Sequence, residues 1–132
     1  PILSFELTQA QINSIKAEDT GMIVYGYLPL MLTRNCPIKN DIGCFECNKH
    51  GKLTDRKGME FPVICSDFPC VEMLNCYPLC MLDRIKEVKT DFVHFYFSIE
   101  SQKQVENIIS LYEQGAKPDF KYTRGLYQRG TL

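Results

Sequence analysis

All seven cysteines of this 132-residue chain fall between residues 35 and 80, and they constrain the fold more than any other feature. Their spacing is C-x7-C-x2-C-x17-C-x4-C-x5-C-x3-C. A C-x2-C turn brings two sulfur atoms to one point, and a returning ribbon of about 15 to 20 residues delivers the third and fourth. The stretch therefore predicts a metal-binding knuckle rather than a disulfide framework.

Two sets of four cysteines fit such a knuckle, and the spacing does not choose between them. The first set is Cys36, Cys44, Cys47 and Cys65. In the second set Cys70 replaces Cys36, as in a zinc ribbon, and in both cases Cys76 and Cys80 are assigned to the buried core. Four thiolates repel one another, so a cation of charge two or more is the natural occupant. Zinc would close a structural site and a [4Fe-4S] cluster would allow electron or oxygen-atom chemistry. The spacing by itself favours zinc.

The residues between the cysteines predict a hairpin. Residues 48–52 and 56–58 are typical of turns, and residues 61–64 are typical of a short returning strand that ends at Cys65. We expect the whole Cys-rich stretch, residues 35–80, to be an insertion in one fragment that spans residues 1–132.

Composition bounds the partners and the compartment. Fifteen basic and sixteen acidic residues leave a net charge of -1, so overall charge does not indicate a polyanion partner. Seven cysteines without a secretory signal favour the reducing cytoplasm. No apolar run approaches the ~20 residues of a membrane span. Because the chain begins at Pro1, we expect an excised piece whose exposed sheet edges could pair in a dimer.

Outside the insertion the pattern predicts an α/β fold. Residues 2–7 and 22–25 are expected to be parallel strands, joined by a helix that the capping box of Thr8 and Gln11 starts. The insertion would then leave from the carboxyl end of the second strand, where α/β proteins build their sites.

The second half of the chain continues the α/β pattern. Residues 79–88 are expected to form a helix, and residues 92–97, apolar on both faces, a buried parallel strand. A helix capped by Ser101 and Gln104 should end at Gly115. A polar, loop-like tail follows.

Few single residues outside the cysteines indicate chemistry. Glu6 stands near the end of the first expected strand and is a candidate for substrate contact, although a structural hydrogen bond is an equal alternative. His50 is expected to be a solvated turn residue, with metal ligation as the alternative, and His94 a core residue or one that lines the sheet. The tail interleaves cations with aromatic rings, which suits single-stranded nucleic acid but also an ordinary solvated terminus. Its residues are Lys121, Tyr122, Arg124, Tyr127 and Arg129.

Several motifs together resemble the collagenase-like peptidase family U-32, closest to its longer bacterial members. They are Tyr25-Gly26-Tyr27-Leu28-Pro29-Leu30-Met31, Asn35-Cys36-Pro37-Ile38, Gly43-Cys44-x-x-Cys47, Leu53-Thr54-Asp55-Arg56-x-Gly58, Phe61-Pro62-Val63-x-Cys65, Asn75 with Pro78-Leu79, and Thr123-Arg124-Gly125. The resemblance implies the later part of a (β/α) TIM-barrel-like fold that lacks the early strands, so the rest of that barrel would be the first partner.

The resemblance also implies a function. Family members are named as peptidases, yet several resemble iron-sulfur proteins that hydroxylate bases in tRNA or rRNA with prephenate as oxygen donor. Carried over, the cluster ligands are Cys36, Cys44 or Cys47, and Cys65, while a cysteine that members often carry seven residues before Cys36 falls on Pro29. Substrate contacts would come from Glu6, Arg124 and Arg129. The fragment alone is expected to be inactive, and the alternative is a zinc-stabilised binding module without catalysis.

Overall fold

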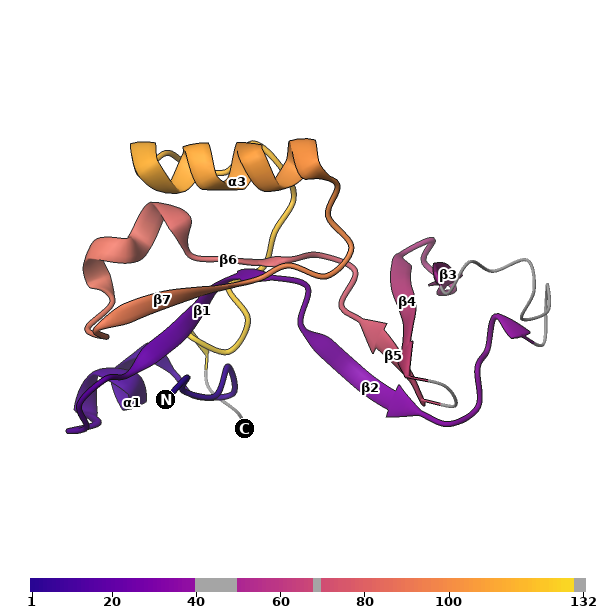
Figure 1. The fold of residues 1–132 in the computed structure, drawn as a ribbon, viewed down its shortest axis with the longest axis horizontal. Helices are drawn as coiled ribbons and strands as arrows, with labels where there is room; N and C mark the ends of the chain where they lie inside the picture. The colour runs from indigo at the N-terminus through magenta and orange to yellow at the C-terminus, as the bar shows by residue number, and fades with distance from the viewer. Residues whose placement is uncertain (40–49, 68–69, 130–132) are drawn as a thin grey trace. The chain divides into compact units, whose positions relative to one another are not determined.

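The structure is a computed structural model that describes residues 1–39, 50–67 and 70–129. The chain forms two compact units (Figure 1). The first contains Pro1–Gly26 and Tyr77–Leu132, and the second contains Tyr27–Cys76. Each unit has its own small sheet.

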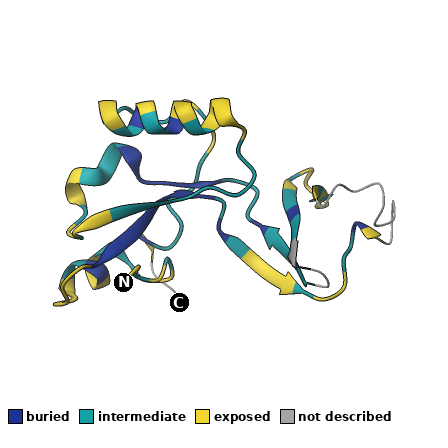
Figure 2. Cartoon of the chain, viewed as in Figure 1, coloured by how far each residue is buried: buried dark blue, intermediate teal, exposed yellow. Residues whose placement is uncertain are grey.

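The first unit is organised around the buried strand β1 (Gly21–Gly26), the central strand of a three-stranded sheet. Strand β7 (Phe92–Tyr96) pairs with it in parallel, and the short β6 (Leu79–Cys80) pairs with it antiparallel. Every residue of β1 is buried, as Figure 2 shows in dark blue. Gly26 has a φ of +153°, and a Cβ there would lie 2.4 Å from the carbonyl oxygen of Tyr96. Only glycine allows these two strand ends to approach so closely.

Both predicted capping boxes are present, and they start α1 and α3. Thr8 caps α1 (Gln9–Ser14) and Ser101 caps α3 (Gln102–Gln114), each with reciprocal bonds to the third residue of its helix. Gly115 ends α3 in the left-handed conformation with a φ of 60°. The helix buries Ile108 and Leu111. It also contacts the sheet, because the rings of Tyr112 and Phe95 lie 5.2 Å apart edge to face.

One element predicted for this unit is wrong, and another is right only for residues 82–87. Residues 2–7 form no strand: Ile2 makes a single parallel bridge to Gly21, and the backbone N–H of Leu7 then donates to Ser4 and closes a turn. Residues 79–88 form no α-helix but β6 followed by the 3-10 helix η1 (Leu82–Glu87). Tertiary hydrogen bonds account for the second difference. The N–H groups of Cys80 and Met81 donate to Thr123 and Val24, which places the start of this segment beside β1.

The second unit is a four-stranded antiparallel sheet in the order β2-β5-β4-β3. Its strands are β2 (Pro29–Thr33), β3 (His50–Thr54), β4 (Glu60–Asp67) and β5 (Cys70–Leu74). The returning strand predicted at residues 61–64 is confirmed as part of β4. The turn predicted over residues 48–52 is wrong for residues 50–52, which pair with β4; residues 48 and 49 lie outside the described part of the chain.

The turn between β3 and β4 is formed as its residues predict. The Asp55 carboxylate accepts hydrogen bonds from the backbone N–H groups of Lys57 and Met59, both at 2.8 Å. Gly58 supplies a φ of +79° in the same turn. A carboxylate that accepts local backbone donors and a glycine with positive φ are the usual means of closing such a turn.

The chain is therefore a mixed α/β protein with two small sheets, and its described residues form no closed barrel. None of the helices over the described ranges has the length and apolarity needed to cross a membrane.

Candidate functional site

Two of the four predicted metal ligands lie at one place in the second unit. Cys36 and Cys65 are both half-buried, and both pack against the small core formed by Ile38, Val63 and Val71. These two cysteines are far apart in sequence, so the fold of the sheet brings them to the same core. Cys44 and Cys47, the other two ligands of the set, lie outside the described residues.

Strand geometry separates Cys70 from this core. Cys65, two residues after the buried Val63 in β4, packs against this core. Cys70 immediately precedes the buried Val71 in β5, and alternation turns adjacent side chains to opposite faces. Cys70 is half-buried and is not among the residues that pack against the core. Of these three cysteines, Cys36 and Cys65 therefore pack against the same core.

The segment that contains Cys44 and Cys47 is flanked by residues that meet at the same core. A Cβ placed on Gly51 would lie 2.7 Å from Cγ1 of Ile38, so the chain just before residue 40 and just after residue 49 is in close contact. Gly51 also pairs with Val63 of β4. The absence of a Cβ at Gly51 lets the Ile38 side chain reach this position.

The donor chemistry of the predicted set suits a metal, although the described residues supply only part of it. Cysteine thiolates are the ligands that zinc and iron-sulfur clusters share. Within residues 1–39, 50–67 and 70–129 no group of three or more histidine, cysteine, aspartate or glutamate residues could hold a metal ion. Cys36 and Cys65 are therefore half of a predicted site.

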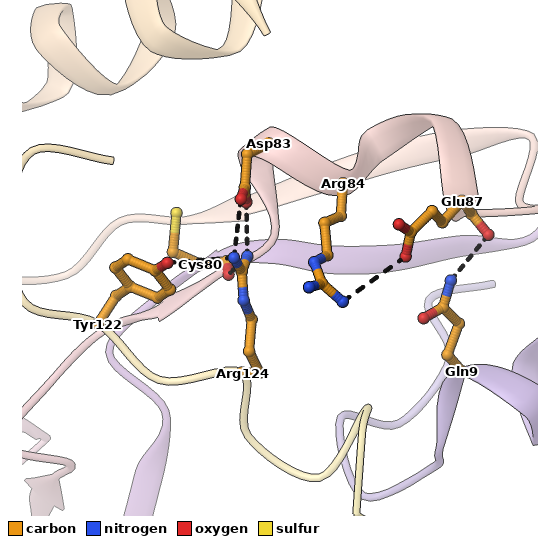
Figure 3. A network of polar contacts seen from close by, with 7 residues as sticks. All are labelled: Gln9, Cys80, Asp83, Arg84, Glu87, Tyr122 and Arg124. Carbon is orange, nitrogen blue, oxygen red and sulfur yellow. Dashed lines mark hydrogen bonds and ion pairs between the residues drawn. The ribbon is translucent and has the colours of Figure 1, made fainter. Parts of the chain in front are cut away.

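A second polar cluster, in the first unit, surrounds the guanidinium group of Arg124 (Figure 3). Nη1 and Nη2 donate to Oδ1 and Oδ2 of Asp83 at 2.6 and 2.8 Å, a bidentate ion pair between side chains that are only 15% and 19% exposed. Nη1 also donates to the carbonyl of Cys80 at 2.8 Å. Nη2 lies 3.1 Å from the Tyr122 hydroxyl, and the guanidinium stacks 4.6 Å from the centre of that ring. Both terminal nitrogens of Arg124 are thus engaged within the protein.

The electrostatics of this cluster follow from its contacts. The hydrogen bonds from Arg124 hold the pKa of the Asp83 carboxyl below its ordinary value, and the same contact raises the pKa of Arg124. Burial raises the pKa of the Cys80 thiol, which keeps it protonated at neutral pH. Asp83 pairs with Arg124 rather than with its neighbour Arg84, which lies 3.9 Å from Glu87. A protonated, buried Cys80 matches its assignment to the core.

The C-terminal tail is built into the first unit. Tyr127 is 2% exposed, and its hydroxyl donates to the carbonyl of Ile23 in β1 at 2.9 Å, while burial raises its pKa. Thr123 bridges Leu79 in parallel. The Phe120 ring lies edge to face with Tyr25, 6.0 Å between centres. The tail has turns, as predicted, but much of it is packed against the unit's own strands.

The remaining predicted residues are scattered. Glu6 is exposed in a turn, where its backbone N–H donates to Ser4 Oγ. Arg129 is exposed. His50 is exposed at the start of β3, and His94 is half-buried in β7 with its ring 6.5 Å from that of Tyr96. The structure therefore does not bring Glu6, Arg124 and Arg129 together into one hydrogen-bonded group among the described contacts.

We expect Asp83→Asn to lower the free energy of unfolding by about 2 kcal/mol at pH 7, because it removes charge-assisted hydrogen bonds from a poorly exposed guanidinium. The Asp83 pKa is lower in the folded chain than in the unfolded one. Its stabilisation is therefore complete above the unfolded pKa of about 4 and is lost as the pH falls through the folded pKa. Urea unfolding of the parent chain and of Asp83→Asn should show that their difference in free energy of unfolding becomes smaller between pH 7 and pH 3.

The matched control is Glu87→Gln, which removes the 3.9 Å contact of the more exposed Arg84. Surface pairs of this kind contribute about 0 to 1 kcal/mol, so little change is expected. If the free energy of unfolding of Asp83→Asn stays below that of the parent chain by the same amount down to pH 3, the ion pair is not the source of the stabilisation.

No protein-family model matches the chain, and neither a curated protein nor a solved structure does. The likeness to family U-32 rests on the motifs quoted above.

Proposed function

We propose that the chain is a segment of a U-32-type protein whose second unit holds a metal through Cys36, Cys44, Cys47 and Cys65. The observation that carries the proposal is the placement of Cys36 and Cys65 against one small core. Their shared position, beside the two ends of the segment with the C-x2-C pair, supports a common ligand.

The size of the second unit supports the same proposal. Its buried apolar side chains over the described residues are Leu28, Ile38, Val63, Val71 and Leu74. A unit of about 50 residues buries too little surface to be stable on a small core alone, and natural proteins of this size commonly add a metal or disulfides. A metal among four cysteines would supply the missing stabilisation.

In the intact protein we propose that the metal is a [4Fe-4S] cluster and that the reaction is hydroxylation of a tRNA or rRNA base, with proteolysis as the activity that the family name suggests. The cluster would supply electron or oxygen-atom chemistry. The exposed Glu6 and Arg129 are available to a substrate. Arg124 is committed to Asp83, so its role in such a protein is to hold the tail that carries Arg129 in place.

The proposal extends to the fold and the compartment. Strands β1 and β7 are parallel, and α3 follows β7 and packs on it, which is the repeating arrangement of a (β/α) barrel. We propose that the remaining strands and helices of such a barrel complete this unit and that the protein works in the cytoplasm, where thiolates stay reduced. A further parallel strand could pair with β7, which is an edge strand, but the antiparallel β6 on the other side of β1 departs from the all-parallel barrel.

Anaerobic purification followed by metal, sulfide and absorption measurements tests the proposal. Iron with acid-labile sulfide and a broad band near ~400 nm is the result expected for the cluster. Stoichiometric zinc with a featureless visible spectrum would instead identify the binding module. A protein that binds neither metal would contradict both proposals.

A zinc-stabilised binding module is the second candidate, and strand β2 favours it. This edge strand exposes three consecutive large apolar residues, Leu30, Met31 and Leu32, which are 51%, 49% and 65% exposed. Natural edge strands are protected by charges, prolines or bulges. No charge lies within β2, and its proline and its register irregularity are both at its start, at Pro29. Such an edge suits pairing with a β-strand of a partner protein or with the same strand of a second copy of the chain. Light scattering that gives only the 15.3 kDa monomer at high concentration would exclude the second copy.

A further inference from the structure

We draw no further inference here: the strongest candidate, the exposed apolar edge strand β2 with Leu30, Met31 and Leu32, belongs to the binding module already proposed, and nothing in the structure shows what covers it.

Discussion

Replacing Cys36 or Cys65 with serine should abolish stoichiometric metal binding, whereas Cys70→Ser should leave it intact. Cys36 and Cys65 share one core, and Cys70 is not packed against it. A serine hydroxyl stays protonated and is a far poorer ligand than a thiolate for zinc or an iron-sulfur cluster. The measurement is the molar ratio of metal to protein after purification, by plasma mass spectrometry, for each variant beside the parent.

The two ligand sets predict different patterns, so the three variants distinguish them. Loss of metal in Cys70→Ser with retention in Cys36→Ser would favour the zinc-ribbon set. Cys44→Ser should lose the metal under either set. Because metal binding supplies folding free energy, the metal-free variants should also unfold the second unit at lower urea concentration. Full metal content in both Cys36→Ser and Cys65→Ser would contradict the ligand assignment.

Replacing Tyr127 with alanine should lower the free energy of unfolding by about 3 to 5 kcal/mol, the range for truncating a large buried aromatic residue. Tyr127 is 2% exposed, and its hydroxyl bonds to the carbonyl of Ile23 in the central strand. The backbone of Tyr127 also accepts a hydrogen bond from the N–H of Gln9, at the start of α1. Its truncation should therefore loosen the tail, β1 and α1 together. Urea unfolding followed by circular dichroism measures the change.

Tyr127→Phe separates the ring from the hydroxyl. It keeps the packing and leaves the Ile23 carbonyl without its partner, which should cost about 1 to 3 kcal/mol. Gln128→Ala, at the exposed neighbouring position, is the matched control and should change stability little. If Tyr127→Ala unfolds at the same urea concentration as Gln128→Ala, the tail does not pack on the first unit as described.

Local signals in the sequence predicted the elements that are stabilised locally. The helix after Ser101 has a capping box, a periodic apolar face and a terminal glycine, and all three are present in α3. The parallel strand predicted at residues 92–97 is confirmed as β7 (Phe92–Tyr96), but the prediction that it is buried is wrong, because β7 is an edge strand and its residues are half-buried or exposed. Where propensity, capping and pattern agree, the same structure follows from each of them.

The elements that were missed depend on partners distant in sequence. Residues 79–88 have a helical pattern, yet Cys80 and Met81 donate backbone hydrogen bonds to Thr123 and Val24. Strands β2 and β5 were not predicted: β2 has consecutive apolar residues rather than alternation, and it is a strand because it pairs with β5. Strand pairing of this kind is a tertiary property, which explains why the periodicity of either segment alone did not indicate it.

The candidate sites likewise include one that the sequence could predict and one that it could not. The cysteine spacing predicted a common centre, and the structure places Cys36 and Cys65 at one core. The role of Arg124 could not be predicted, because its partner Asp83 lies 41 residues away in the sequence. Its neighbour Tyr122 also gives the tail the pattern of cations and aromatic residues that is typical of nucleic-acid binding. In the structure the guanidinium of Arg124 stacks on the ring of Tyr122 within the first unit. Asp83 directly follows the apolar run of residues 79–82, and an acidic residue at the end of such a run is the signal that could have indicated a buried partner.

X-ray absorption at the edge of the bound metal tests the central claim most directly, because it counts the sulfur atoms around the ion. A shell of four sulfur neighbours at about 2.3 Å in the parent chain is the predicted result. For zinc all four are cysteine thiolates, whereas each iron of a [4Fe-4S] cluster has three sulfides and one cysteine thiolate, so the sulfide content tells the two apart. A shell made only of oxygen or nitrogen, or a purified chain with no bound metal to measure, would contradict the claim that these cysteines converge on one ion.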